Sequence, residues 1–253
     1  MKYYIELAPL GVFSLKEAIA IIGSEPNAKS VLSRMIRGNM IRRVKKNLYS
    51  VVDPVNQDDA VSRFVIASHI TEHSFIGLHS AFEFYGFYNQ TYSEIQVLSE
   101  KRFLDFEYGD YRYRYFSTKT LTQVETIQGT KVTSLERTIV DSINSLGKSM
   151  DAEELVKCLS LVHCVDEEKI KAMLSEYGKD SLYRKVGYVL SYFQKDLRLS
   201  EDFFLFCKTN SNVLNYAYLY NGDTQGLAFI KEWGLYAYKD LRQLSYKGGE
   251  IDV

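Results

Sequence analysis

The sequence predicts an α+β protein of two domains, a winged helix-turn-helix over residues 1–55 and a larger mixed domain of helices and antiparallel strands over residues 56–253. Two short amphipathic helices joined by a tight turn come first, and a β-hairpin follows them directly, which is the element order of a winged helix. The composition then changes near residue 55. Segments with helical periodicity and strand-like segments follow.

The first domain opens with a helix over residues 2–8, which Pro9 and Gly11 end. Ser14 and Glu17 have the spacing of a capping box, so a second helix is expected to begin there and to stop at Gly23. A third helix runs from the turn at residues 24–27 to about Gly38, with its apolar residues on one face.

A hairpin with strands over residues 40–44 and 48–52 follows this helix and forms the wing. Asn47 in its turn can adopt the left-handed conformation that such turns demand.

The larger domain is expected to contain both helices and strands. Gly109-Asp110 is expected as a hairpin turn, and Thr133–Glu136 as a second capping box. Turns are expected at Asn221–Asp223 and Gly226, and a loose end at Gly248-Gly249. The helices are predicted over residues 58–70, 77–86, 134–146, 152–162, 167–177 and 182–193, and the strands over 94–98, 103–108 and 111–116.

Positive charge gathers in residues 29–51, which hold seven Lys or Arg and no Asp or Glu, although the chain has a formal net charge of −1. A duplex presents closely spaced phosphates, and each cation that meets one releases condensed counterions. Arg34 and Arg37 are candidates for groove contacts, because the polar face of a helix can reach base edges. The full set of expected DNA-binding residues comprises Lys29, Ser33, Arg34 and Arg37 on the helix and Arg42, Arg43, Lys45 and Lys46 on the wing.

Two other interpretations of these charges stay open. The basic face can be a solvated surface of a protein-interaction winged helix that binds an acidic partner. The chain can also be a metal-dependent nuclease that the winged helix targets to DNA, with Asp141 or Glu167-Glu168-Lys169 recruited to the chemistry, although solvated helix positions explain these residues better.

Motifs for catalysis are missing from the sequence: it has no G-x-S-x-G, P-loop, H-E-x-x-H or dinucleotide fingerprint. His69, His73, His79 and His163 lack the spacing of a metal-binding set. We therefore expect no enzymatic activity, no catalytic residue, no cofactor and no metal.

A run of aromatic and basic residues suggests a second possible nucleic-acid contact. Tyr111–Phe116 alternates aromatic and basic residues, which suits base stacking or phosphate contacts. An amphipathic strand that covers a core is the favoured interpretation, with Arg112 and Arg114 on one face. The aromatic groups in residues 82–88 and 216–220 are likewise expected in a core or an interface.

The three cysteines, Cys158, Cys164 and Cys207, are odd in number and lack C-x-x-C spacing, so we expect buried structural thiols. The N-terminus does not resemble a signal peptide, and no segment reaches the ~20 apolar residues of a membrane span. These features predict a cytoplasmic protein without a membrane partner.

Three segments resemble the AbiEi-type antitoxins of type IV toxin–antitoxin systems, which act in abortive phage infection. IRRVKKNLYSV is similar to the family's G-x-I-x-R-V-x-x-G-x-Y pattern through Gly38, Ile41, Arg43, Val44 and Tyr49, with Asn47 where glycine is usual. Gly77–Ala81 with Tyr85-Gly86-Phe87, and Lys131–Asp141, resemble two later segments of the family. Together they span roughly the first 145 residues.

The resemblance implies an antitoxin that represses its own operon by binding inverted repeats in the promoter through the winged helix. It also implies that the C-terminal domain counteracts a nucleotidyltransferase-like toxin encoded next to it, without a stable complex between the two proteins.

Overall fold

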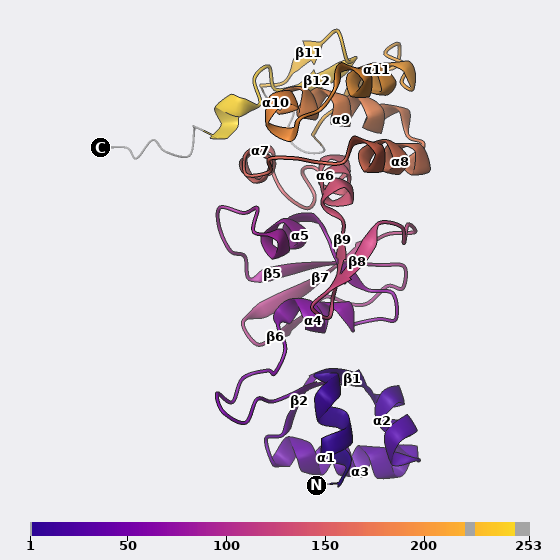
Figure 1. The fold of residues 1–253 in the computed structure, drawn as a ribbon, viewed down its shortest axis with the longest axis vertical. Helices are drawn as coiled ribbons and strands as arrows, with labels where there is room; N and C mark the ends of the chain where they lie inside the picture. The colour runs from indigo at the N-terminus through magenta and orange to yellow at the C-terminus, as the bar shows by residue number, and fades with distance from the viewer. Residues whose placement is uncertain (1, 221–225, 246–253) are drawn as a thin grey trace, which may run out of the picture. The chain divides into compact units, whose positions relative to one another are not determined.

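The computed structural model describes residues 2–220 and 226–245 and confirms the α+β fold, with an N-terminal winged helix followed by a larger α/β part (Figure 1). The chain divides into two compact units. The first comprises Met1–Ile76 and Tyr92–Val132, and the second comprises Gly77–Thr91 and Thr133–Val253. This division differs from the predicted boundary at residue 55, because the winged helix shares its unit with a large sheet.

The winged helix has three helices and a three-stranded antiparallel sheet in the order β1-β3-β2. The first strand, β1, was not predicted, because its three residues are too few to show an alternation. The elements are α1 (Lys2–Leu7), a 3₁₀ turn (Ala8–Leu10), β1 (Val12–Ser14), α2 (Leu15–Ile22), α3 (Glu25–Arg37), β2 (Ile41–Lys45) and β3 (Leu48–Val51).

Local signals fix the ends of these elements as the sequence predicts. The Ser14 hydroxyl accepts from the Glu17 amide at 3.2 Å, and the Glu17 carboxylate accepts from the Ser14 amide at 2.7 Å, which completes the capping box. Gly23 ends α2 with a φ of 103°. Asn47 adopts a φ of 64° in the wing turn, which confirms its expected left-handed conformation.

The rest of the first unit is built on a six-stranded sheet in the order β6-β7-β5-β4-β9-β8. The sheet is mixed: β7 pairs in parallel with β5, and β4 in parallel with β9, whereas β4–β5 and β6–β7 are antiparallel. The strands are β4 (Phe75–Ile76), β5 (Glu94–Ser99), β6 (Phe106–Tyr108), β7 (Tyr111–Ser117), β8 (Val124–Ile127) and β9 (Thr130–Thr133).

The helix predicted over residues 58–70 is shorter. It is α4 (Arg63–Ser68), because the Ser62 hydroxyl accepts from the Val65 amide at 3.4 Å and caps it. The strand predicted from residue 103 begins at Phe106.

Lys45 explains why the winged helix and the large sheet form one unit. Its ammonium lies 5.0 Å from the ring centroid of Phe103 and 5.1 Å from that of Phe106, so strand β2 packs on the edge strand β6. The loop after β3 adds to this junction, because the Tyr108 hydroxyl donates to Asp59 at 2.7 Å.

The second unit consists of helices around one apolar core, with a small sheet in the order β10-β12-β11. Trp233 packs so closely on Gly187 that a Cβ there would lie 2.3 Å from the indole ring. The elements are α5 (Leu78–Tyr85), α6 (Leu135–Asn144), α7 (Ala152–Ser160), α8 (Glu167–Tyr177), α9 (Asp180–Ser191), α10 (Gln194–Leu197), α11 (Glu201–Thr209), β10 (Ala217–Tyr218), β11 (Ala228–Ile230), β12 (Leu235–Ala237) and a 3₁₀ turn (Arg242–Ser245).

The second capping box is not formed as predicted. Ser134, one residue later than Thr133, is the N-cap of α6 and accepts from the Arg137 amide at 3.2 Å, while Thr133 bonds Thr138. The turn predicted at residues 221–223 and the loose end at residues 248–249 lie outside the described residues. Among those residues, none of the helices combines the length and the apolar character that crossing a bilayer requires.

Candidate nucleic-acid interface

Helix α3 presents one polar face to solvent. Ala28, Val31, Leu32 and Met35 are buried in the core of the winged helix, where they pack with residues of α1, α2, β1 and β2. Because an α-helix repeats every 3.6 residues, this apolar stripe turns the opposite positions outward. The structure thus brings the four predicted helix residues to one exposed face: Lys29, Ser33, Arg34 and Arg37.

The cations of this face differ in their partners. Lys29 pairs with Glu25 one turn earlier at 2.6 Å, and both side chains are more than half exposed, so water and salt screen the pair. Among the described residues, neither Arg34 nor Arg37 has an ion pair. Both lie in the last turn of α3, where cations also interact favourably with the helix dipole.

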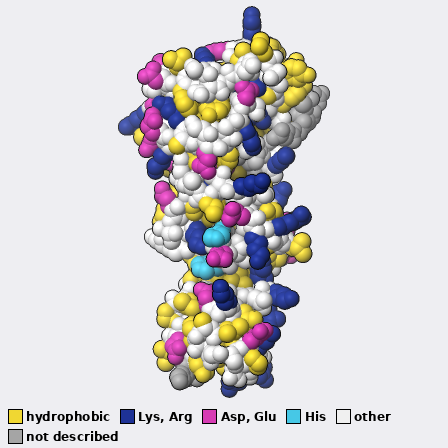
Figure 2. Space-filling model, turned by 90° about the vertical axis from the view of Figure 1, so that its right-hand side faces the viewer, with side chains coloured by type: hydrophobic (Ala, Val, Ile, Leu, Met, Phe, Trp, Pro, Cys, Tyr) yellow, Lys and Arg dark blue, Asp and Glu magenta, His cyan; other side chains and the backbone are white. Residues whose placement is uncertain are grey.

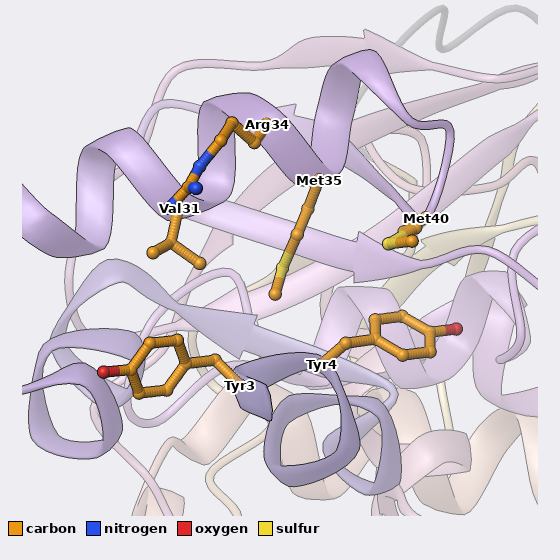
Figure 3. A pocket seen from close by; sticks show the side chains of 6 residues that line it. All are labelled: Tyr3, Tyr4, Val31, Arg34, Met35 and Met40. Atoms are coloured by element: carbon orange, nitrogen blue, oxygen red, sulfur yellow. The ribbon is translucent and has the colours of Figure 1, made fainter. Parts of the chain in front are cut away.

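Arg34 borders a pocket of about 230 Å³ between α1 and α3. Figure 3 shows Tyr3 and Tyr4 of α1 facing Val31 and Met35 across it. Val31, Met35 and the tyrosine rings line the pocket together with Arg34, so the aliphatic part of Arg34 has apolar groups beside it. An arginine in such a place keeps its charged end in water.

Strand β2 separates the four predicted wing residues into two pairs. Arg42 donates to the carbonyl oxygen of Gln57, and Lys45 lies over Phe103 and Phe106, so both are half-buried against their own unit. Burial lowers the pKa of Lys45. The structure therefore gives Arg42 and Lys45 contacts within the chain that the prediction of phosphate contacts did not foresee.

Arg43 and Lys46 form the other pair and are exposed. The Arg43 guanidinium lies 5.9 Å from the ring centroid of Tyr49, and neither residue has an ion pair in the described part of the chain. The wing is short, and the Asn47 carbonyl in its turn accepts from the Leu15 amide at 2.9 Å. This bond ties the wing turn to the start of α2 and limits the wing's motion.

The charge balance of the winged helix is positive. Residues 1–55 hold nine Lys or Arg against four Asp or Glu, whereas the remaining residues hold 22 against 28. In Figure 2, Lys and Arg side chains lie mainly along one edge of the lowest part of the molecule, which contains the winged helix. A surface of this kind attracts polyanions.

The acids considered for a nuclease have other roles. Asp141 is buried rather than solvated, contrary to the expectation, because its carboxylate pairs with Arg137 at 3.2 Å and accepts from the Tyr177 hydroxyl. Glu167 accepts from the amide and hydroxyl of Ser200 at 2.9 and 2.8 Å and so links the start of α8 to that of α11.

Strand β7 has the predicted alternation. Tyr113 is buried and stacks on Phe106 with centroids 5.0 Å apart, while Arg112 and Arg114 lie on the other face. Each arginine has a nearby acid, Asp105 at 3.5 Å and Glu94 at 3.3 Å respectively. These contacts favour the amphipathic strand over a nucleic-acid surface.

The cysteine prediction holds for two of three residues. Cys158 and Cys207 are buried free thiols, as expected, whereas Cys164 is exposed, because it lies in the loop between α7 and α8. Cys158 bonds Glu154 and lies within 4.8 Å of His79, a grouping that the histidine spacing did not reveal.

No protein-family model matches the chain, and no curated protein does either. Among solved structures, the chain is similar to the crystal structure of the RV2827C protein from Mycobacterium tuberculosis. The two share 13% sequence identity with a TM-score of 0.66, and the match covers 98% of this chain and 93% of the other. At this identity the similarity supports the fold alone.

Proposed function

We propose that the protein is a DNA-binding antitoxin that represses its own operon. The observation that carries the DNA-binding part is the exposed face of α3, where Arg34 and Arg37 have no acid partner among the described residues. A helix of ~10 Å diameter fits the major groove, and exposed guanidinium groups pair with guanine edges or phosphates.

The contact surface that we propose is smaller than the sequence-based set. It consists of Arg34, Arg37, Ser33 and Lys29 on α3, with Arg43 and Lys46 on the wing as backbone contacts. Arg42 and Lys45 are left out because they contact Gln57, Phe103 and Phe106 within their own unit.

The antitoxin part rests on the resemblance of three segments to AbiEi-type antitoxins. It implies inverted repeats in the promoter as the DNA partner, a cytoplasmic location and a nucleotidyltransferase-like toxin as the functional counterpart, without a stable complex. It involves no enzymatic step, and two of the acids weighed for a nuclease, Asp141 and Glu167, bond to Arg137 and Ser200.

A point variant tests the two parts separately. Removal of residues 1–55 is unsuitable, because it would take Lys45 away from Phe103 and Phe106 and expose both rings. Arg34→Gln/Arg37→Gln changes only exposed side chains. We expect it to relieve repression of a reporter driven by the operon promoter and to keep protecting cells from the toxin gene.

The outcomes separate the alternatives. Repression unchanged by the variant contradicts the proposed surface. Absence of promoter binding by the wild-type chain at physiological salt favours a protein-interaction module, and cleavage of plasmid by pure protein with Mg²⁺ favours a nuclease. Failure of the wild-type chain to protect cells from the toxin gene contradicts the antitoxin part alone.

A further inference from the structure

Three side chains that bind metals in other proteins meet inside the second unit. His79 comes from α5, and Glu154 and Cys158 come from α7. One ligand atom of each, an imidazole nitrogen, a carboxylate oxygen and a thiol sulfur, lies within 4.8 Å of the other two. Glu154 and Cys158 are four residues apart, so both point from the same face of α7.

The distances within the cluster are short. His79 Nε2 lies 3.0 Å from Glu154 Oε1, and Cys158 Sγ lies 3.5 Å from the same oxygen. All three side chains are buried: the side chains of His79 and Glu154 are each 5% exposed, and Cys158 is 0% exposed. The imidazole nitrogen and the thiol sulfur therefore converge on one carboxylate oxygen in the interior of the unit.

The nitrogen–oxygen and sulfur–oxygen separations are close to those that a zinc ion imposes, and the nitrogen and sulfur atoms lie within 4.8 Å of each other. Tetrahedral Zn²⁺ binds nitrogen and oxygen at about 2.0–2.2 Å and sulfur at about 2.3 Å, which puts neighbouring ligand atoms about 3.3–3.6 Å apart. Movements of a few tenths of an ångström would bring the imidazole nitrogen and the carboxylate oxygen into that range. We propose that His79, Glu154 and Cys158 form a Zn²⁺ site.

The charges of the three groups suit a divalent cation. A carboxylate and a thiolate neutralise Zn²⁺, and the neutral imidazole adds no charge, so the complete site is uncharged within an apolar core. Burial, and then the Glu154 carboxylate, raise the pKa of the Cys158 thiol. Binding therefore replaces the thiol proton, which leaves to solvent, and the neutral imidazole has to carry its single proton on Nδ1 so that Nε2 can bind the ion.

The exposed loop after α5 lies beside the cluster. Gln90 lies on this loop, and its side-chain amide is 3.5 Å from the second oxygen of Glu154, Oε2. Three protein ligands leave a fourth position on the ion, which a water molecule can fill.

Cobalt is the probe that reports the proposed thiolate directly. Untagged full-length protein is treated with a chelator and titrated with Co²⁺, which replaces Zn²⁺ in tetrahedral sites. We expect one Co²⁺ per chain and a thiolate-to-cobalt charge-transfer band in the near ultraviolet, which one equivalent of Zn²⁺ removes. Wild-type protein that binds no Co²⁺ and shows no such band overturns the proposal.

The other cysteines supply matched controls. Cys158→Ser removes the sulfur with little change of volume and should abolish the band, whereas Cys207→Ser, a buried thiol outside the cluster, and Cys164→Ser, an exposed one, should keep it. A band that survives Cys158→Ser, or that disappears with Cys164→Ser, contradicts the site. Arg34→Gln/Arg37→Gln should bind Co²⁺ like the wild type, so metal binding and DNA binding are tested independently.

Discussion

Two arginines of the winged helix and two of the second unit occupy opposite environments. Arg34 and Arg37 are exposed and have no ion pair in the described part of the chain. Arg137 and Arg184 are 0% and 2% exposed, and each pairs with an acid one helical turn away, Asp141 or Asp180. The same residue type therefore holds the core together in one unit and stays available to a partner in the other.

The wing repeats this contrast within five residues. Arg42 and Lys45 contact their own unit, whereas Arg43 and Lys46 are exposed. A dense run of positive charge in a sequence is thus not a single surface. The strand and its bulge between Arg43 and Lys45 decide which cations reach solvent.

Removing the cation of a buried pair should have the largest effect. Arg137→Met leaves the Asp141 carboxylate in the core with Tyr177 but without its counter-ion, so we expect a loss of about 3–5 kcal/mol in the free energy of unfolding. Urea denaturation at neutral pH measures it. A loss below 1 kcal/mol would mean that this pair behaves like a surface pair.

The pH dependence of this variant sharpens the test. Burial raises the pKa of Asp141, and Arg137 opposes that shift, so removing Arg137 raises the pKa further. A raised pKa in the folded state favours folding at low pH, and this contribution is lost as the pH rises through the folded pKa. The loss in the free energy of unfolding of Arg137→Met, relative to wild type, should therefore become smaller as the pH is lowered.

The exposed arginines should show the reverse pattern, with little effect on stability and a clear one on binding. Arg34→Gln and Arg37→Gln should each weaken promoter binding by about 1–3 kcal/mol if they contact bases. Each should change the free energy of unfolding by no more than about 0.5 kcal/mol. Gel shifts and urea denaturation give the two values. Arg102→Gln, an exposed arginine beyond the winged helix, is the matched control and should leave affinity unchanged.

Two neighbouring lysines of the wing, one half-buried against the sheet and one exposed in the turn, can be compared directly. Lys46→Gln should lower the slope of log affinity against log salt by about 1, the value for one lost phosphate contact. Lys45→Gln should leave that slope unchanged, because the Lys45 ammonium lies over Phe103 and Phe106. Equal slopes for the two variants would contradict the proposed division of the wing.

Local signals predicted most of the winged helix. Ser14 with Glu17, Gly23 and Asn47 act through bonds or dihedral angles within a few residues, so the sequence alone reveals them. The exposed face of α3 follows from the helical repeat in the same way.

Contacts between distant segments could not be predicted. Lys45 meets Phe103 only after β2 has packed on β6, and Asp141 is buried because Tyr177 and Arg137 surround it. The cluster of His79 with Glu154 and Cys158 joins residues 75 positions apart. Its one local signal, the four-residue spacing of Glu154 and Cys158, is common on helices.

Lys45 gives the smallest expected effect, a dependence of stability on pH, and it tests the contrast between cations that contact their own unit and exposed ones. Burial lowers its pKa, while the ring faces of Phe103 and Phe106 favour the charged form and limit the shift. The unfolded chain keeps the ordinary value of 10.5, so between the lowered pKa and pH 10.5 the folded state binds fewer protons than the unfolded state. Stability from this group therefore rises with pH in that window.

The comparison with Lys45→Met isolates this contribution. As the pH is raised towards 10.5, wild-type protein should gain stability relative to Lys45→Met, by less than the ~1.4 kcal/mol per pH unit of a full proton. No such trend for Lys45→Met would mean that Lys45 is as solvated as an exposed lysine, and the wing would then present both lysines to DNA.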